Sequence, residues 1–178
     1  MMIVEIAGGI WANSLALLSD AGHMLADLLA LGMALFAVTV AARPATARKT
    51  YGYYRVEILS ALTNGVVLVA MALAIFYEGY LRFQNPEPVT GGLVLLVAGA
   101  GLLANLIGIW LLSRAGGDVN IRSARMHMAG DALSSCGVVA GGVVITLTSW
   151  YTIDSLISFG IGVVILVGAY RIIRETVD

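Results

Sequence analysis

Charged side chains are scarce in this chain. Asp, Glu, Lys and Arg make up 12% of its 178 residues, about half the share found in soluble domains. Hydrophobic residues make up 60%, and the mean hydropathy is +0.93. This composition is typical of an integral membrane protein. The formal net charge is −1 and no basic patch with interleaved aromatic residues occurs, which excludes nucleic acid as an expected partner.

Cysteine is almost absent as well. Cys136 stands alone, which excludes an internal disulfide, and its place inside an apolar run favours a small packing residue over a reactive or metal-ligating thiol. The N-terminus has no basic segment and no small-residue cleavage site, so we expect no cleavable signal peptide. No GxxxxGK[ST] loop occurs, so an ATP-driven mechanism is not expected.

Six apolar runs predict an all-α membrane protein, a six-transmembrane-helix bundle forming a single transmembrane domain. The predicted helices cover about residues 2–13, 15–42, 56–82, 89–112, 122–149 and 153–173. Each of the last five runs is long enough to cross a bilayer. The first is interrupted by Glu5 and rises only about 16 Å of the ~30 Å needed. Either the sequence begins inside a membrane helix, which we favour, or this element is partial and leans on its neighbours.

The distribution of basic residues predicts the orientation of the bundle. With six crossings and both termini cytoplasmic, nine of the ten basic residues fall on the cytoplasmic side and only Arg82 falls outside. An excess of Lys and Arg in cytoplasmic loops is the usual rule for membrane proteins. The nine are Arg43, Arg48, Lys49, Arg55, Arg114, Arg122, Arg125, Arg171 and Arg174.

The chain contains only two histidines, and an aspartate follows each of them four residues later: His23 with Asp27, and His127 with Asp131. A spacing of four places both side chains of a pair on one helical face. An ionisable side chain within hydrocarbon normally faces a partner, a cavity or an ion. Each pair alone could be a structural bridge between helices. Together they form a ligand set suited to a tetrahedral divalent metal, above all zinc.

The two motifs, HMLADLL and HMAGDAL, lie three helices apart and therefore run in opposite directions. This relation is expected of an inverted repeat with a site near the middle of the membrane. If the second and fifth helices are antiparallel neighbours, His23 should lie near the level of Asp131, and Asp27 near that of His127.

Several other polar positions admit two interpretations. Asp20 could attract cations, although a role in capping the second helix is favoured because an acidic side chain suits a helix N-terminus. Asn64 and Asn105 could line a hydrated ion path or, as we prefer, tie helices together. Glu78 and Arg82 are expected to form an ion pair at the end of a helix.

Two further features also remain open. The GxxxG pattern from Gly137 to Gly141 could mark a dimer seam, but close packing within one bundle is favoured. Arg55 and Glu57, at the cytoplasmic start of the third predicted helix, are either a gate or interfacial charges.

Three segments, SLALLSDAGHMLADLLALG, YGYYRVEILSALTNG and HMAGDALSS, resemble the cation diffusion facilitator family, and bacterial zinc, cobalt and cadmium exporters in particular. The resemblance extends from about Val4 to Thr176. It implies a zinc/proton antiporter of the bacterial inner membrane that works as a homodimer by alternating access. It also implies that His23, Asp27, His127 and Asp131 hold the transported Zn²⁺, with Cd²⁺ and Co²⁺ as further substrates.

The sequence departs from the family pattern in three places. Family members usually continue into a cytoplasmic metal-binding domain, which we do not expect in a chain that stops at Asp178. Some members carry histidines before the third helix as a second cation site, whereas the segment from Arg43 to Arg55 has Lys49 and Tyr53 and no histidine. We therefore predict that this second site is absent. The loop between the fourth and fifth helices also lacks a histidine-rich run, which favours a bacterial origin.

Three classes of function are compatible with the two His-x-x-x-Asp motifs. In a carrier, protons and Zn²⁺ exchange on the same imidazoles and carboxylates. A zinc-dependent membrane hydrolase usually keeps three protein ligands and an open water position, and four matched ligands argue against it. A metal sensor or a purely structural protein would bind zinc without moving it. The sequence favours a non-enzymatic carrier.

Overall fold

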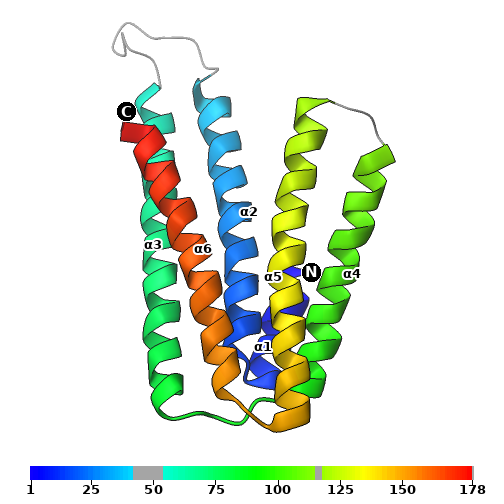
Figure 1. Ribbon diagram of the computed structural model, residues 1–178. Coiled ribbons are helices and arrows are strands. Elements are labelled where there is room, and N and C mark those ends of the chain that lie inside the picture. Colours follow the sequence, from blue (N-terminus) through cyan, green and yellow to red (C-terminus); the bar gives the residue numbers. More distant parts are fainter. Residues whose placement is uncertain (42–53, 115–117, 178) are drawn as a thin grey trace, which may run out of the picture.

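The structure is a computed structural model that describes residues 1–41, 54–114 and 118–177, and within these ranges it holds six α-helices and no strand (Figure 1). The prediction of an all-α bundle is confirmed. The helices are α1 (Met2–Ala12), α2 (Leu15–Ala41), α3 (Tyr54–Gln84), α4 (Gly91–Arg114), α5 (Val119–Thr148) and α6 (Thr152–Val177).

The largest difference from the predicted helix limits lies in α6, which continues to Val177 instead of ending near residue 173. The prediction stopped where the apolar run ended, but Arg and Glu are good helix formers and allow the helix to continue past that point. Likewise, α5 begins at Val119, directly after Asp118, because the polar residues of its first turn also tolerate helical geometry.

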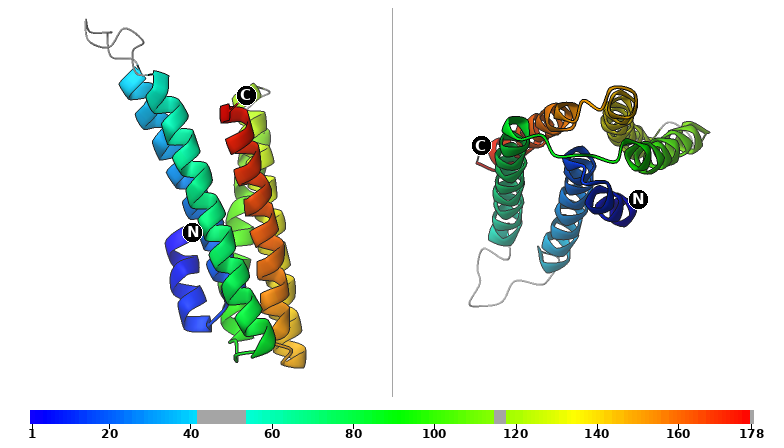
Figure 2. Two further views of the ribbon diagram at one scale, coloured as in Figure 1. Left: turned by 90° about the vertical axis from the view of Figure 1, so that its left-hand side faces the viewer. Right: turned by 90° about the horizontal axis from the view of Figure 1, so that it is seen from below.

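Five helices, α2 to α6, are long and apolar enough to cross a membrane, while α1 is an apolar helix of 11 residues. α1 ends at Ala12, and the next residue, Asn13, adopts a left-handed conformation with φ 53° and ψ 38° and donates its backbone N–H to the carbonyls of Gly9 and Ile10. This tight turn folds α1 back along α2 and against α4, and Figure 2 shows α1 as a short helix beside the bundle.

The long helices pack mainly as two pairs, α3 against α6 and α4 against α5, while α2 contacts α1, α3, α5 and α6. We call the end of the bundle that holds the α1–α2 turn, the α3–α4 loop and the α5–α6 turn the lower end, as drawn in Figure 1. The C-terminus lies at the upper end. α2 runs upward and α5 runs downward, as the inverted-repeat interpretation predicted.

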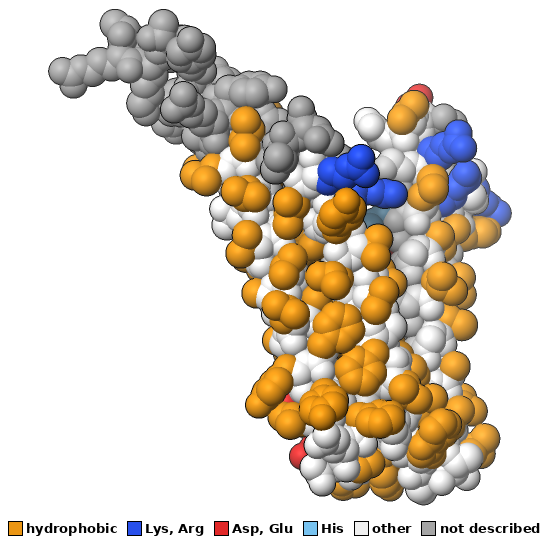
Figure 3. Space-filling model, turned by 60° about the vertical axis from the view of Figure 1, so that its left-hand side comes forward, with side chains coloured by type: hydrophobic (Ala, Val, Ile, Leu, Met, Phe, Trp, Pro, Cys, Tyr) orange, Lys and Arg blue, Asp and Glu red, His pale blue; other side chains and the backbone are white. Residues whose placement is uncertain are grey.

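The outer surface of the bundle is apolar. Large hydrophobic side chains such as Trp11 (76% exposed), Leu96 (70%) and Leu147 (79%) point away from the core. Figure 3 shows hydrophobic side chains covering the flank and basic side chains at the upper end. Such a surface fits lipid contact, and the positive-inside rule predicts that the basic upper end is the cytoplasmic end.

The lower end of the bundle is held by Asp154, in the first turn of α6. Its carboxylate accepts hydrogen bonds from the Ser14 hydroxyl (2.6 Å) and from the backbone N–H groups of Leu15 (2.6 Å) and Ala16 (3.2 Å). The two N–H groups belong to the first turn of α2, where they would otherwise have no hydrogen-bond acceptor. The expectation that Asp20 caps this helix is therefore wrong, because α2 already begins at Leu15 and places Asp20 in its second turn.

Arg82 fastens the same end. Its Nε lies 2.8 Å from Oε1 of Glu78, as the spacing of four predicted, and its Nη1 donates to the carbonyl of Asn13 (2.8 Å). This second bond links the end of α3 to the turn between α1 and α2. Arg82 therefore pairs with Glu78 within α3 and also connects α3 to the α1–α2 turn.

Two predictions about α5 have different outcomes. A side chain on Gly141 would collide with Ile157 of α6, which supports close packing within the bundle for this part of the GxxxG pattern. Cys136, in contrast, is exposed, so its assignment as a packing residue is wrong. The buried face of α5 runs through Ser135, Val138 and Gly142, and Cys136 lies outside it.

Candidate metal centre

The two His-x-x-x-Asp motifs meet where α2 passes α5. Nε2 of His23 lies 3.7 Å from Oδ2 of Asp27 and 4.0 Å from Oδ1 of Asp131. Nε2 of His127 lies 3.7 Å from Oδ2 of Asp27 and 3.7 Å from Oδ2 of Asp131. Each histidine therefore faces the aspartate of its own helix and that of the other helix. The register predicted from the antiparallel motifs is observed, and we call these four residues the candidate metal centre.

The four side chains are not equally placed. Ligand atoms of His23, Asp27 and Asp131 all lie within 4.8 Å of one another. Two ligands of a tetrahedral zinc ion with bonds of about 2.0 Å would lie about 3.3 Å apart, so zinc binding would have to draw these ligand atoms closer together. His127 lies outside the set of three and is 55% exposed, while Asp131 is 14% exposed. Three side chains thus form a compact group, and the fourth closes it from one side.

A cavity of about 700 Å³ borders the candidate metal centre beside the first residues of the chain, Met1 and Met2. It is lined by Asp27 and His127 and by apolar residues of α1 and α2 that extend upward from Asp27 as far as Ala34. The half-exposed His127 borders this space. On the lower side, Leu17 and Asp20 are buried, and a second cavity extends from His23 between α5 and α6 past Gly137.

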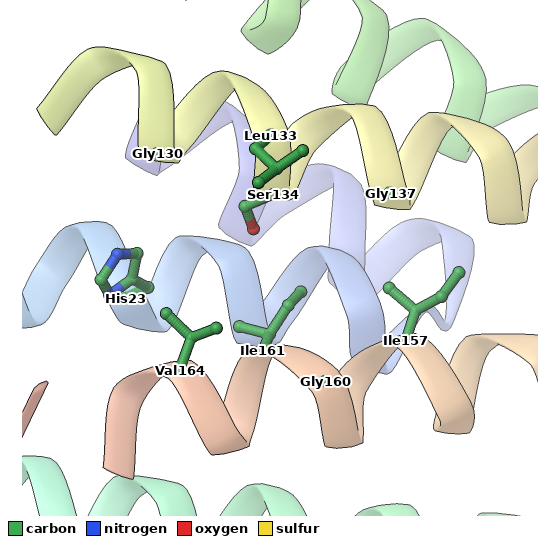
Figure 4. Close-up of a pocket in the computed structure, with 9 residues that line it drawn as sticks. All are labelled: His23, Gly130, Leu133, Ser134, Gly137, Ile157, Gly160, Ile161 and Val164. Carbon is green, nitrogen blue, oxygen red and sulfur yellow. The ribbon is translucent and has the colours of Figure 1, made fainter. Parts of the chain in front are cut away.

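The second nitrogen of the His23 ring has an unusual environment. Its Nδ1 is buried and has no hydrogen-bond partner within the described part of the chain. Metal-bound histidines usually donate this second N–H to a partner that fixes the ring. His23 borders an apolar cavity of about 400 Å³ between α5 and α6, and Figure 4 shows the ring at one end of this space, opposite Val164. A ring with one nitrogen unbonded remains able to change its tautomer.

Below the metal centre lies a second polar layer that the sequence did not reveal. Asp20 accepts hydrogen bonds from the hydroxyl groups of Ser134 (2.5 Å) and Ser135 (3.2 Å) on α5. The two serines follow Asp131 by three and four residues, and Asp20 precedes His23 by three, so this contact lies one turn from the metal centre on both helices. The one trace of this layer in the sequence is the Ser-Ser pair after HMAGDAL, and that pair alone does not show which way the serines face.

Comparison with known proteins identifies the family. The cation efflux transmembrane domain matches residues 1–178. This chain belongs to the cation efflux family. The resemblance noted from the three sequence segments is thereby confirmed.

The relatives of this cation efflux domain are bacterial transport proteins. It is 42% identical over 178 residues to the zinc transporter ZitB of Pectobacterium atrosepticum, covering 99% of this chain and 56% of that one. It is 39% identical to the metal cation efflux system protein CzcD of Cupriavidus metallidurans, with the same coverage. It is 40% identical to a cadmium, cobalt and zinc/H⁺–K⁺ antiporter of Bacillus subtilis, covering 99% of this chain and 58% of that protein.

This cation efflux domain thus spans a little over half the length of the curated relatives that it matches. Its five membrane-spanning helices and its bacterial transporter relatives agree with the predicted location, a multi-pass protein of the bacterial inner membrane.

The remaining polar positions of this domain can now be placed. Asn64 is buried, its Oδ1 has no hydrogen-bond partner among the described residues, and it borders a cavity of about 280 Å³ between α2, α3 and α6. That oxygen does not tie helices together, contrary to our preference. The side chains of Arg55 and Glu57 and the segment 42–53, for which no second cation site is predicted, lie outside the described residues.

Proposed function

We propose that this chain is the membrane domain of a carrier that exports Zn²⁺ from the cytoplasm in exchange for protons. The transported ion binds to His23, Asp27, His127 and Asp131. The observation that carries the proposal is the meeting of these four side chains, from two antiparallel helices, at distances of 3.7–4.0 Å between imidazole nitrogen and carboxylate oxygen. The names of the zinc, cadmium and cobalt transporting relatives support the choice of substrate.

The chemistry of the four side chains supports a borderline-soft divalent ion as substrate. Imidazole nitrogens suit zinc and its neighbours, while two carboxylates balance the double positive charge. Cd²⁺ and Co²⁺ are further substrates for the same reason. Mg²⁺ and Ca²⁺ prefer oxygen ligands only and are disfavoured by the two imidazoles.

Proton coupling follows from the same ligands. Zinc binds only to neutral imidazole and ionised carboxylate, so protons and zinc compete for one set of atoms. A carrier that releases zinc on one side and takes up protons there exchanges the two. The Bacillus subtilis relative is named as an antiporter that includes H⁺, which supports this part of the proposal.

We propose that the ion reaches the centre from the cytoplasmic side, as export requires, and leaves on the other side in an alternating-access cycle. Cavities border the centre beside Asp27 and His127 and, between α5 and α6, beside His23. Following the family resemblance, we propose that the carrier is a homodimer, which the mass of the purified protein in detergent tests.

Equilibrium zinc binding by purified variants tests the metal centre. Asp27→Asn and Asp131→Asn should each weaken zinc binding by at least about tenfold, because second-shell changes alone already cost that much in other zinc sites. Asp118→Asn is the matched control, since Asp118 is an exposed aspartate at the start of α5 without a side-chain cap bond. Wild-type affinity in both site variants would refute the assignment. Hydrolytic activity without zinc movement would favour the membrane hydrolase.

A further inference from the structure

A second pair of carboxylates, Glu5 of α1 and Asp20 of α2, lies deep in the bundle outside the candidate metal centre. Glu5 is 2% exposed and Asp20 is 4% exposed. Asp20 precedes His23 by three residues, which places it about 5 Å further toward the lower end along α2. Both carboxyls are related to the Ser135 hydroxyl, which contacts Asp20 directly and borders the space beside Gly101 that Glu5 enters.

The two carboxylates have different surroundings. Asp20 accepts the hydroxyl hydrogen bonds of Ser134 and Ser135. Oε2 of Glu5 is buried and has no hydrogen-bond partner in the described residues. Its Oε1 lies beside Gly101 of α4, where a Cβ atom would come within 2.7 Å of that oxygen and within 3.8 Å of the Ser135 hydroxyl. The Glu5 carboxyl therefore lies beside a small space that the Ser135 hydroxyl and the terminal methyl of Met1 also border.

This difference decides which of the two carboxyls holds a proton. Two buried carboxylates within electrostatic range cannot both carry a charge at low cost, so the pair takes up a proton. Hydrogen bonds to an ionised carboxylate stabilise its charge, and Asp20 receives two of them. A buried charge without such bonds is far more costly than a neutral acid. The proton therefore belongs on Glu5.

We propose that Glu5 is a proton-binding residue of this carrier that is protonated while the metal centre is empty and ionised while the centre holds a divalent cation. The proposal rests on the proposed function and extends it to a residue that is no metal ligand. Placing two positive charges near Glu5 favours its ionised form, and the proton that it loses passes to bulk water. When the cation leaves, Glu5 takes a proton from bulk water again.

The charged groups near Glu5 come from α2 and α5. α2 contributes Asp20, which itself interacts with His23, and α5 contributes Asp131. α4 contributes Gly101, which carries no charge but leaves the space that the carboxyl occupies. The cation at the metal centre would thus act on Glu5 through space, without a shared ligand. Glu5 would carry part of the proton exchange outside the metal ligands.

Counting the protons released on zinc binding tests the proposal. Purified wild-type protein, Glu5→Gln and Glu87→Gln are titrated with zinc in weakly buffered solution. Glu87 is the control because it is an exposed glutamate in the α3–α4 loop. Glu5→Gln should retain zinc binding but release about one proton fewer per zinc than wild type, while Glu87→Gln should match wild type. Equal proton release by Glu5→Gln and wild type would overturn the proposal.

Infrared difference spectra of the wild-type protein give a second test that does not depend on how the variant folds. Metal-free protein should show the carbonyl stretching band of a protonated carboxylic acid, and zinc should remove it. Labelling glutamate carboxyls with ¹³C should shift this band, because a glutamate and not an aspartate carries the proton. A band that zinc leaves unchanged, or one insensitive to the label, would contradict the assignment to Glu5.

These outcomes separate the inference from the proposed function. If Asp27→Asn and Asp131→Asn bind zinc like wild type, the metal centre is wrong and the inference loses its basis. If those variants lose zinc binding while Glu5→Gln releases the full number of protons, only the role of Glu5 is wrong.

Discussion

His23 and Asp131 face each other across the contact between α2 and α5, with Nε2 of the histidine 4.0 Å from Oδ1 of the aspartate. They are 108 positions apart in the sequence yet belong to the compact group formed with Asp27. Because each motif supplies one residue to this contact, neither helix can complete the centre alone. Any relative movement of α2 and α5 changes the distance between the two side chains and so links ion binding to the shape of the bundle.

Replacing His23 should change which ion the centre prefers. His23→Asp exchanges a nitrogen ligand for oxygen, and the variant should discriminate less between Zn²⁺ and larger or harder ions such as Cd²⁺ or Mn²⁺. His127→Asp should have a smaller effect, because His127 is half exposed and lies outside the compact group of three. Competition binding of metal pairs by the two variants measures this. If His23→Asp keeps the wild-type metal preference, or if His127→Asp changes the preference more than His23→Asp does, His23 is not the histidine that determines metal choice.

Zinc binding should weaken as the pH falls. The ligands bind zinc only as neutral imidazole and ionised carboxylate, so lower pH favours the metal-free protein. The dissociation constant should rise about tenfold per pH unit for each proton that zinc displaces. Calorimetric titrations of the wild-type protein between about pH 7.5 and pH 6 would measure the slope. A dissociation constant that does not change over this range would exclude competition between protons and zinc.

Removing the Asp154 carboxylate should destabilise the fold without touching the metal centre. Asp154→Ala leaves the Ser14 hydroxyl and the N–H groups of Leu15 and Ala16 without their acceptor. We expect a loss of about 2–4 kcal/mol, since unpaired buried donors cost about 1–3 kcal/mol each and the residues partly adjust. Thermal unfolding in detergent measures the change. The control is Asp118→Ala, because Asp118 makes no side-chain cap bond. This control variant should unfold like wild type. Equal stability of Asp154→Ala and Asp118→Ala would refute the capping role.

The predicted and observed structures agree where hydrophobic runs and turn residues determine the outcome. The six helices follow from apolar runs separated by breakers, and the level of His23 relative to Asp131 follows from two motifs on antiparallel helices. The rotation of each helix about its own axis, in contrast, could not be predicted from the sequence. Helices that are apolar on all sides carry no periodic signal that tells a buried face from a lipid-facing one. The exposure of Cys136, the two serines that face Asp20 and the unbonded Asn64 oxygen therefore could not be predicted.

The Asp154 cap illustrates a related limit. The sequence marks an aspartate at the start of an apolar run, and such a residue is expected to serve its own helix. Asp154 instead serves the start of α2, because the α5–α6 turn and the α1–α2 turn both lie at the lower end of the bundle. Only the packing of the helices reveals which N-terminus its carboxylate reaches.

Proton-driven zinc movement is the central claim, and transport into sealed vesicles tests it most directly. The full-length protein and its Asp27→Asn variant are reconstituted into liposomes with a pH gradient and equal zinc on both sides. Zinc should accumulate on the more acidic side in vesicles with wild-type protein, because protons leaving that side drive zinc in the opposite direction, and Asp27→Asn vesicles should show no accumulation. Zinc movement that does not depend on the pH gradient would contradict antiport and indicate a passive carrier. Zinc binding without any zinc movement would indicate a sensor.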